Sequence, residues 1–203
     1  MPNRKACLRD RPRFTSAGLA STTSPRHRPG PQRGRALLVA AGLAATSEHA
    51  LVSLLAINGL RVSEALGADI EALGLERGHR TLTVLRKGGK VVTIPLAPRT
   101  ARAIDLAIGE RVEGPIFLGR DGERLDRHAA WRIVRRLARK VGINKQVGPH
   151  ALRHAFITAA LDAGVPWRDV QEAASHADPR TTMRYDDPRK LHRTRAKAQG
   201  AWS

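Results

Sequence analysis

Four residues with chemically active side chains, His150, Arg153, His176 and Tyr185, lie within one short run of the sequence, residues 149–185. Tyr185 is the only tyrosine in 203 residues, so general aromatic usage does not account for it. His150 and Arg153 are three positions apart, just after Pro149, a residue that suits the first turn of a helix. This spacing places both side chains on one helix face, which we expect to bind an anion.

Two donors or cations beside a phenol suit a reaction at a phosphodiester. A neutral phenol has a pKa of about 10 and needs a base to take its proton. Negative charge then develops on the non-bridging oxygens of the phosphate, and each fixed donor typically contributes ~10²- to 10³-fold to the rate. This chemistry requires further cations elsewhere in the chain.

Prolines and glycines predict the helices that carry these residues. One helix begins at Pro149 and ends before Gly164. Its core-facing stripe is predicted to be Leu152, Phe156, Ala159, Ala160 and Ala163. The opposite side is then free for chemistry.

Two more helices are expected beyond residue 164. One begins at Pro166, and the other begins at Asp178-Pro179 and carries Tyr185. His176 lies in the loop between them.

Two upstream segments could supply the further cations. Leucines at positions 51, 54 and 55 predict a buried helix that ends at Asn58-Gly59, and Arg61 follows at the turn, where it can face a cleft.

Residues 80–96 alternate apolar and polar around Gly88-Gly89, which is typical of a β-hairpin with Lys87 at its tip. The alternative for Lys87 is a solvated tip residue, and Lys90 is a nearby competitor. The Gly-Gly-Lys run lacks the spacing of a phosphate loop and no helix follows, so nucleotide binding is not expected.

Residues 98–108 and 125–141 predict two more helices, the second with Asp126 as its N-cap. The second helix has an apolar face and, opposite it, the basic residues Arg132, Arg135, Arg136, Arg139 and Lys140. Such a face is either solvated or lies along a DNA backbone. The predicted fold class is mainly α with a small antiparallel β-sheet, an α+β domain.

The formal net charge of +18 indicates a polyanionic partner, nucleic acid first and anionic membrane second. A protein that is basic merely for solubility is the alternative.

Cys7 is the only cysteine, so no internal disulfide can form, and no apolar signal segment follows Arg4 and Lys5. The apolar run 36–45 is too short to span a bilayer. We expect a cytoplasmic protein that binds no membrane.

The runs PHALRH, SH and TTMRY resemble the tyrosine recombinase (phage integrase) family. The catalytic domain of that family carries a His-x-x-Arg helix, a second histidine and a nucleophilic tyrosine nine positions beyond it, the spacing of His176 and Tyr185. The family's Gly-Leu-Arg-x-Ser-Glu segment is matched by GLRVSE with Arg61, and its hairpin lysine by RKGGK with Lys87. Ser175 departs from the family, which usually has glycine there; serine should be tolerated unless that position needs a positive φ.

The resemblance implies a site-specific recombinase or integrase that cleaves and rejoins DNA strands through a 3′-phosphotyrosyl intermediate, without metal, nucleotide or other cofactor. Tyr185 would be the nucleophile, His150 the general base and Lys87 the general acid. Arg61, Arg153 and His176 would contact the phosphate. The implied partners are double-stranded DNA and, during synapsis, other recombinase protomers.

The expected organisation is a disordered basic arm at 1–35, a tyrosine recombinase catalytic domain at 36–187 and a basic tail at 188–203. The arm holds nine Arg or Lys against one acidic residue. Members of the family normally have a helical core-binding domain in front of the catalytic one. Residues 1–35 cannot form it, so the chain is expected to lack that domain.

Three alternatives stay open. His150 and His154 have the spacing of a zinc hydrolase motif, but Ala151 occupies the glutamate position and Arg153 would repel a metal; His154 is otherwise a core or supporting histidine. A non-catalytic, DNA-binding integrase remnant or regulator is the second alternative. Type IB topoisomerases share the chemistry, although nothing in the chain suggests their larger enclosing domains.

Overall fold

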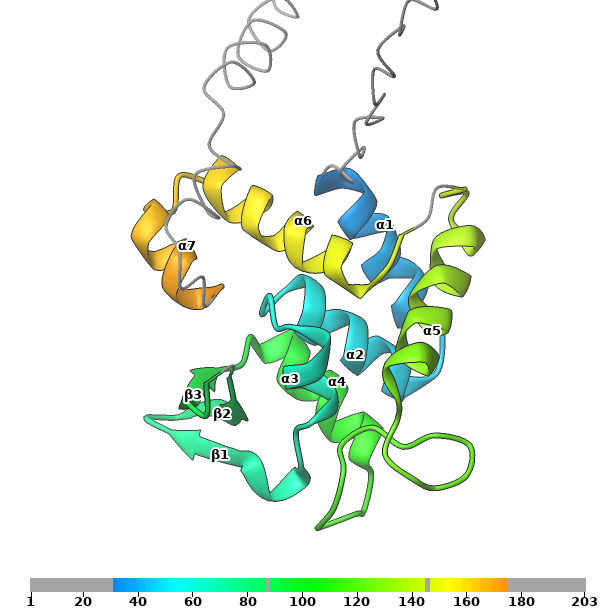
Figure 1. Ribbon diagram of the computed structural model, residues 1–203, viewed down its shortest axis with the longest axis vertical. Helices are drawn as coiled ribbons and strands as arrows, with labels where there is room; N and C mark the ends of the chain where they lie inside the picture. The colour runs from blue at the N-terminus through cyan, green and yellow to red at the C-terminus, as the bar shows by residue number, and fades with distance from the viewer. Residues whose placement is uncertain (1–30, 87, 145–146, 175–203) are drawn as a thin grey trace, which may run out of the picture.

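The computed structural model describes residues 31–86, 88–144 and 147–174 of the chain (Figure 1). Lys87, His176, Tyr185 and the helix expected to begin at Asp178-Pro179 lie outside the described residues. Arg61, His150 and Arg153 lie within them.

The central element is helix α2 (Thr46–Ala56), in which residues 50–55 are all buried. A helix whose side chains are buried all round must be packed on every side by other elements of the fold. Helices α1 (Pro31–Gly42), α4 (Pro98–Ile108) and α6 (Pro149–Asp162) pack directly against it, and the short α3 (Val62–Leu66) and α5 (Arg127–Lys140) touch it as well. Figure 1 shows α2 between α6 on one side and α4 on the other. The last helix in the described part of the chain, α7 (Trp167–Ala173), packs on α6.

The sheet is antiparallel, with its three strands in chain order: β1 (Leu73–Glu76), β2 (His79–Leu85) and β3 (Val91–Pro95). A short 3-10 helix at Ile70–Ala72 leads into β1. Leu82 is paired with Leu73 on one side and Ile94 on the other, and Leu82 and Val84 are buried in the core. The predicted hairpin is therefore present, and it gains a third strand that the sequence pattern did not indicate.

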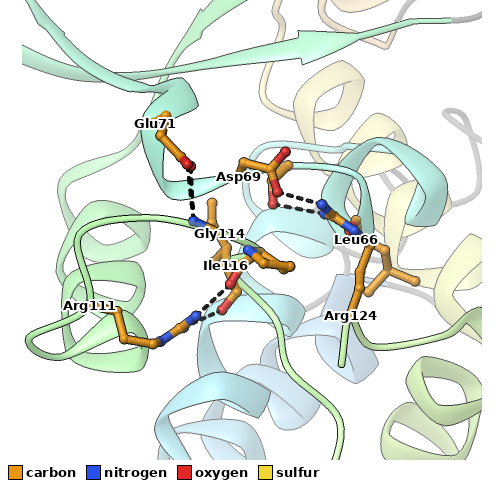
Figure 2. A network of polar contacts seen from close by, with 9 residues as sticks. Leu66, Asp69, Glu71, Arg111, Gly114, Ile116 and Arg124 are labelled. Atoms are coloured by element: carbon orange, nitrogen blue, oxygen red, sulfur yellow. Dashed lines mark hydrogen bonds and ion pairs between the residues drawn. The ribbon is translucent and has the colours of Figure 1, made fainter. Parts of the chain in front are cut away.

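Polar contacts hold the connection between α4 and α5, residues 109–126, against the body (Figure 2). Arg124 contacts Asp69 at 2.5 Å and donates to the carbonyl of Leu66 at 3.0 Å. Arg111 donates to the carbonyls of Pro115 and Ile116 at 2.6 and 3.0 Å. The backbone N–H of Gly114 donates to the Glu71 carboxylate at 3.1 Å. These contacts add to two isolated antiparallel bridges, Leu118 with Arg124 inside the connection and Asp69 with Pro115 between the body and the connection.

One predicted boundary and one predicted face differ from the structure. Helix α1 begins at Pro31, inside the range assigned to the basic arm, because proline suits a first helical turn. In α6 the expected stripe is wrong in part: Ala159 and Ala163 are exposed, whereas Arg153, Ala155 and Ile157 are buried. The reason is that α6 faces two partners, α1 and α2 near its start and α7 near its end, so that its buried side shifts along the helix.

The other helices agree with their predictions. Residues 98–108 form α4 as expected, and Asp126 caps α5 by accepting a hydrogen bond from the Ala129 N–H at 2.7 Å. None of the described helices is both long enough and apolar enough to cross a bilayer.

Candidate functional site

The site is built around the turn between α2 and α3. Gly59 has a φ of +66°, and the ring of Phe156 from α6 lies 2.3 Å from the position that a Cβ atom there would occupy. Both constraints demand glycine, because a left-handed backbone and a ring in van der Waals contact exclude a side chain. The turn therefore brings α6 directly against the backbone that leads into Arg61.

Arg61 is the N-cap residue of α3, and Glu64 fixes it. The Glu64 carboxylate accepts hydrogen bonds from the Arg61 backbone N–H at 2.9 Å and from the Arg61 Nη1 at 2.7 Å. The Glu64 side chain is buried, whereas 33% of the Arg61 side chain stays exposed. Glu64 thus holds Arg61 in place, while part of the Arg61 side chain stays exposed.

Arg153 is buried, which corrects the expectation that it projects from a free face. Its Nη1 donates to the backbone carbonyl of Gly59, which lies 94 positions earlier in the chain. A buried guanidinium is stable only when its donors are satisfied. This contact places Arg153 at the same turn that presents Arg61.

His150 occupies the first turn of α6, after the N-cap Gly148 and Pro149, and its side chain is exposed. Partial desolvation by surrounding protein, and then the positive charges of Arg153 and Arg61, lower the pKa of His150 below its usual range. Each of these factors disfavours the imidazolium form. His150 is therefore kept neutral, the state in which an imidazole accepts a proton.

His154 contacts His150 one turn along α6. Their Nε2 atoms lie 2.6 Å apart, and the rings meet edge to face at 81° with their centroids 4.1 Å apart. Two ring nitrogens this close must share a single proton, one as donor and one as acceptor. His154 thereby restrains the orientation of the His150 ring, a supporting role compatible with the sequence interpretation. Among the described residues, no three His, Cys, Asp or Glu side chains are grouped as metal ligands would be.

The structure thus brings together three of the six candidate residues, Arg61, His150 and Arg153, from α3 and α6. Lys87, His176 and Tyr185 lie outside the described residues, and their positions remain predictions. Sequence reasoning missed that the Gly59 carbonyl accepts a hydrogen bond from Arg153 two positions before Arg61. Its only local signal was the Asn58-Gly59 helix stop.

A mainly helical domain with this small sheet is the fold of tyrosine recombinase catalytic domains. The crystal structure of XerA recombinase superposes with a TM-score of 0.70 and 29% identity, covering 84% of this chain and 65% of that one. The profile of the Phage integrase family matches residues 35–192. The chain belongs to this family.

Two relatives indicate how much of a longer protein the similarity covers. Tyrosine recombinase XerC of Pelobacter propionicus is 37% identical over 142 residues, which are 68% of this chain and 46% of the relative. Tyrosine recombinase XerD of Mycobacterium tuberculosis is 36% identical over 146 residues, again 68% and 46%. The chain spans about half the length of the curated relatives it matches.

The Gly59 turn yields a stability prediction. Gly59→Ala should lower the free energy of unfolding by about 2–4 kcal/mol, because a left-handed alanine and a displaced Phe156 ring both cost energy. Urea unfolding followed by circular dichroism measures the change. Gly78→Ala is the matched control, since Gly78 also has a positive φ, +80°, but no atom lies within 4 Å of its Cβ position. Equal losses in the two variants would contradict the close packing of Phe156.

The lowered pKa of His150 yields a second prediction. In the folded chain the ring should titrate below about 6.5, the ordinary histidine value. The stability that the neutral His150 ring contributes to the folded chain is present in full above the ordinary histidine pKa. It is lost as the pH falls through the lowered pKa, because the unfolded chain binds the proton more readily. NMR titration of labelled histidine, with His150→Gln to assign the signal, measures the midpoint. A midpoint at or above 6.5 would contradict the influence of the two arginines.

Proposed function

We propose that this chain is the catalytic domain of a site-specific DNA recombinase or integrase that cleaves and rejoins strands through a 3′-phosphotyrosyl intermediate. The observation that carries the proposal is the pairing of Arg61 and Arg153 at the Gly59 turn, with a neutral, exposed His150 beside them. Two fixed guanidinium groups suit a phosphodiester, and a neutral imidazole suits proton transfer.

In the proposed reaction the phenol oxygen of Tyr185 attacks the scissile phosphorus, and His150 accepts the phenol proton. The bond from phosphorus to the 5′ oxygen breaks as Lys87 donates a proton to that oxygen. The products are a 3′-phosphotyrosyl link and a free 5′ hydroxyl, which reverses the step when it attacks the link. Because the covalent link conserves the phosphodiester, rejoining needs no external energy source.

The arginines have different parts in this mechanism. Arg61 is held by Glu64 and a third of its side chain is exposed, so a non-bridging oxygen can approach it. Arg153 is buried against Gly59, where its charge acts at short range in a poorly solvated environment. His176 is proposed to donate to the same phosphate.

Helix α5 supports DNA as the partner. Trp131 of α5 lies 3.0 Å from the position of a Cβ on Gly148, so that α5 adjoins the start of α6. Its exposed Arg and Lys side chains are Arg127, Arg132, Arg136, Arg139 and Lys140. Arg136 forms an ion pair with Glu48 of α2. With a net charge of +18, an exposed basic face near His150 suits the phosphate backbone of DNA.

The wider organisation belongs to the same proposal. The partners are double-stranded DNA and other protomers during synapsis, and the reaction takes place in the cytoplasm. The proposed catalytic domain is 36–187 together with the start of α1 from Pro31, and basic segments of the sequence lie on either side of it. The proposed residues need no metal ion and no nucleotide.

Covalent capture tests the proposal. Short duplexes of randomised sequence, each with a nick in one strand, should yield an adduct that resists denaturation, because the fragment with the new 5′ hydroxyl diffuses away. Tyr185→Phe should abolish the adduct and change DNA binding by no more than about threefold, since only a hydroxyl is lost. An adduct that persists in Tyr185→Phe would remove Tyr185 as the nucleophile. Binding without any adduct in the wild-type chain would favour a non-catalytic DNA-binding protein.

The role of Lys87 is tested with a duplex that carries the DNA sequence recovered from that adduct. Lys87→Ala should slow cleavage by roughly 10²- to 10⁴-fold, the range of general acid catalysis. A 5′-bridging sulfur at the scissile phosphate should restore much of the rate, because a thiolate leaves without a proton. Lys90→Ala is the matched control on the same hairpin. If Lys90→Ala shows the defect and the rescue instead, the general acid is Lys90.

A further inference from the structure

Arg86 connects two elements that lie far apart in the sequence. Its Nη1 and Nη2 donate to the backbone carbonyls of Glu172 and Ala173, at 3.3 and 3.4 Å and across 86 and 87 positions of the chain. These carbonyls belong to the last turn of α7. The last carbonyls of a helix have no partner within the helix, so a guanidinium there acts as a cap.

The backbone of the same residue closes the β2–β3 hairpin. The N–H of Arg86 donates to the carbonyl of Lys90 at 2.8 Å, and its carbonyl accepts from the N–H of Gly89 at 3.2 Å. The Nε atom is enclosed by protein, so Arg86 is not a freely solvated surface arginine. One residue therefore holds the end of the hairpin through its backbone and the end of α7 through its side chain.

Helix α7 has few other attachments in the described part of the chain. Its buried residue Val170 and the following Ala174 join Ile157 of α6 in a small cluster, separate from the main core. This cluster fastens α7 to α6 but does not set its position relative to the sheet. Figure 1 shows α7 on the side of the molecule where the sheet lies. The Arg86 contacts join the end of α7 to the β2–β3 hairpin.

We propose that Arg86 is a positioning residue, which caps α7 and thereby fixes the hairpin against the end of this helix. The proposal rests on the function proposed above, because the residue after Arg86 is Lys87 and the chain leaves α7 toward His176, two positions beyond Ala174. Lys87 directly follows Arg86 in the sequence, and His176 lies three positions beyond Ala173, whose carbonyl Arg86 binds. Loss of the contact should therefore misalign the general acid with respect to the phosphate.

The physical basis is electrostatic as well as geometric. Both hydrogen bonds are long, so each contributes modestly. The guanidinium charge also lies at the negative end of the helix dipole, where a cation is stabilising. Lysine at this position would keep the charge but lose the planar fork that reaches two carbonyls at once.

The first test measures the contact itself. In Arg86→Ala, hydrogen exchange at the last amides of α7, including that of Ala174, should be faster by roughly 2- to 5-fold, the effect expected of a lost charged cap. Exchange in α4 should not change. Arg102→Ala, which removes the same charge from an exposed site on α4, is the matched control and should leave α7 unchanged. Unchanged exchange in α7 of Arg86→Ala would overturn the proposal.

The second test separates positioning from mere stability. With a duplex whose scissile phosphate carries the ordinary 5′ oxygen, Arg86→Ala should cleave roughly 10- to 100-fold more slowly, as expected of a displacement of about 1 Å. With a 5′-bridging sulfur the defect should be several-fold smaller, since that leaving group needs no acid. A variant that only lowers the folded fraction slows both substrates equally. Arg86→Lys should give intermediate values, and Arg102→Ala should keep the wild-type ratio.

The outcomes distinguish this proposal from the function on which it rests. Faster exchange in α7 with an unchanged ratio of oxygen to sulfur rates would make Arg86 structural only and would overturn the positioning role. Failure of the wild-type chain to form any adduct would refute the proposed function. In that case the exchange measurement alone decides whether Arg86 joins the hairpin to α7.

Discussion

Burial of the Arg153 guanidinium is the constraint on which the described site depends. A charged group removed from water needs a close acceptor, and the carbonyl of Gly59 supplies it. The left-handed backbone of Gly59 lets its carbonyl point at α6 in this way. That residue is glycine because Phe156 leaves no room for a Cβ. The charge of one residue thus fixes the backbone conformation of a turn 94 positions away.

This constraint also orders the surroundings. Arg61 follows Gly59 by two positions, and the buried Glu64 receives both its backbone N–H and its guanidinium. His150 lies within the field of both arginines, and His154 restrains its ring. The site therefore depends on side chains that are not catalytic candidates. Phe156, Glu64 and His154 set the geometry that the candidates use.

Local signals in the sequence predicted most of the elements. Pro98, Asp126 and Pro149 mark helix starts, and Gly88-Gly89 marks the hairpin, because caps and turns are decided by nearby residues. Strand β1 escaped prediction because it is only four residues long, none of them is fully buried and one is Gly74, so they show no clear alternation. The burial of Arg153 and the cap by Arg86 could not be foreseen, since each depends on a carbonyl contributed by a remote part of the chain.

The packing of α1 has a consequence for synthesis on the ribosome. Helix α1 contacts α5 and α6, and Gly34 lies so close to Ala155 that an added Cβ would be only 3.3 Å away. Helix α2 can cover part of its apolar side early, but the part that packs on α6 stays uncovered until about 120 further residues have been made, which takes roughly 6–25 s at typical elongation rates of about 5–20 residues per second. Throughout that interval Leu37 and Ala41, both fully buried at the end, have no permanent neighbours on α6. The nascent chain must remain soluble while α1 is only partly covered. The many basic residues near α1 in the sequence oppose association of such chains by mutual repulsion.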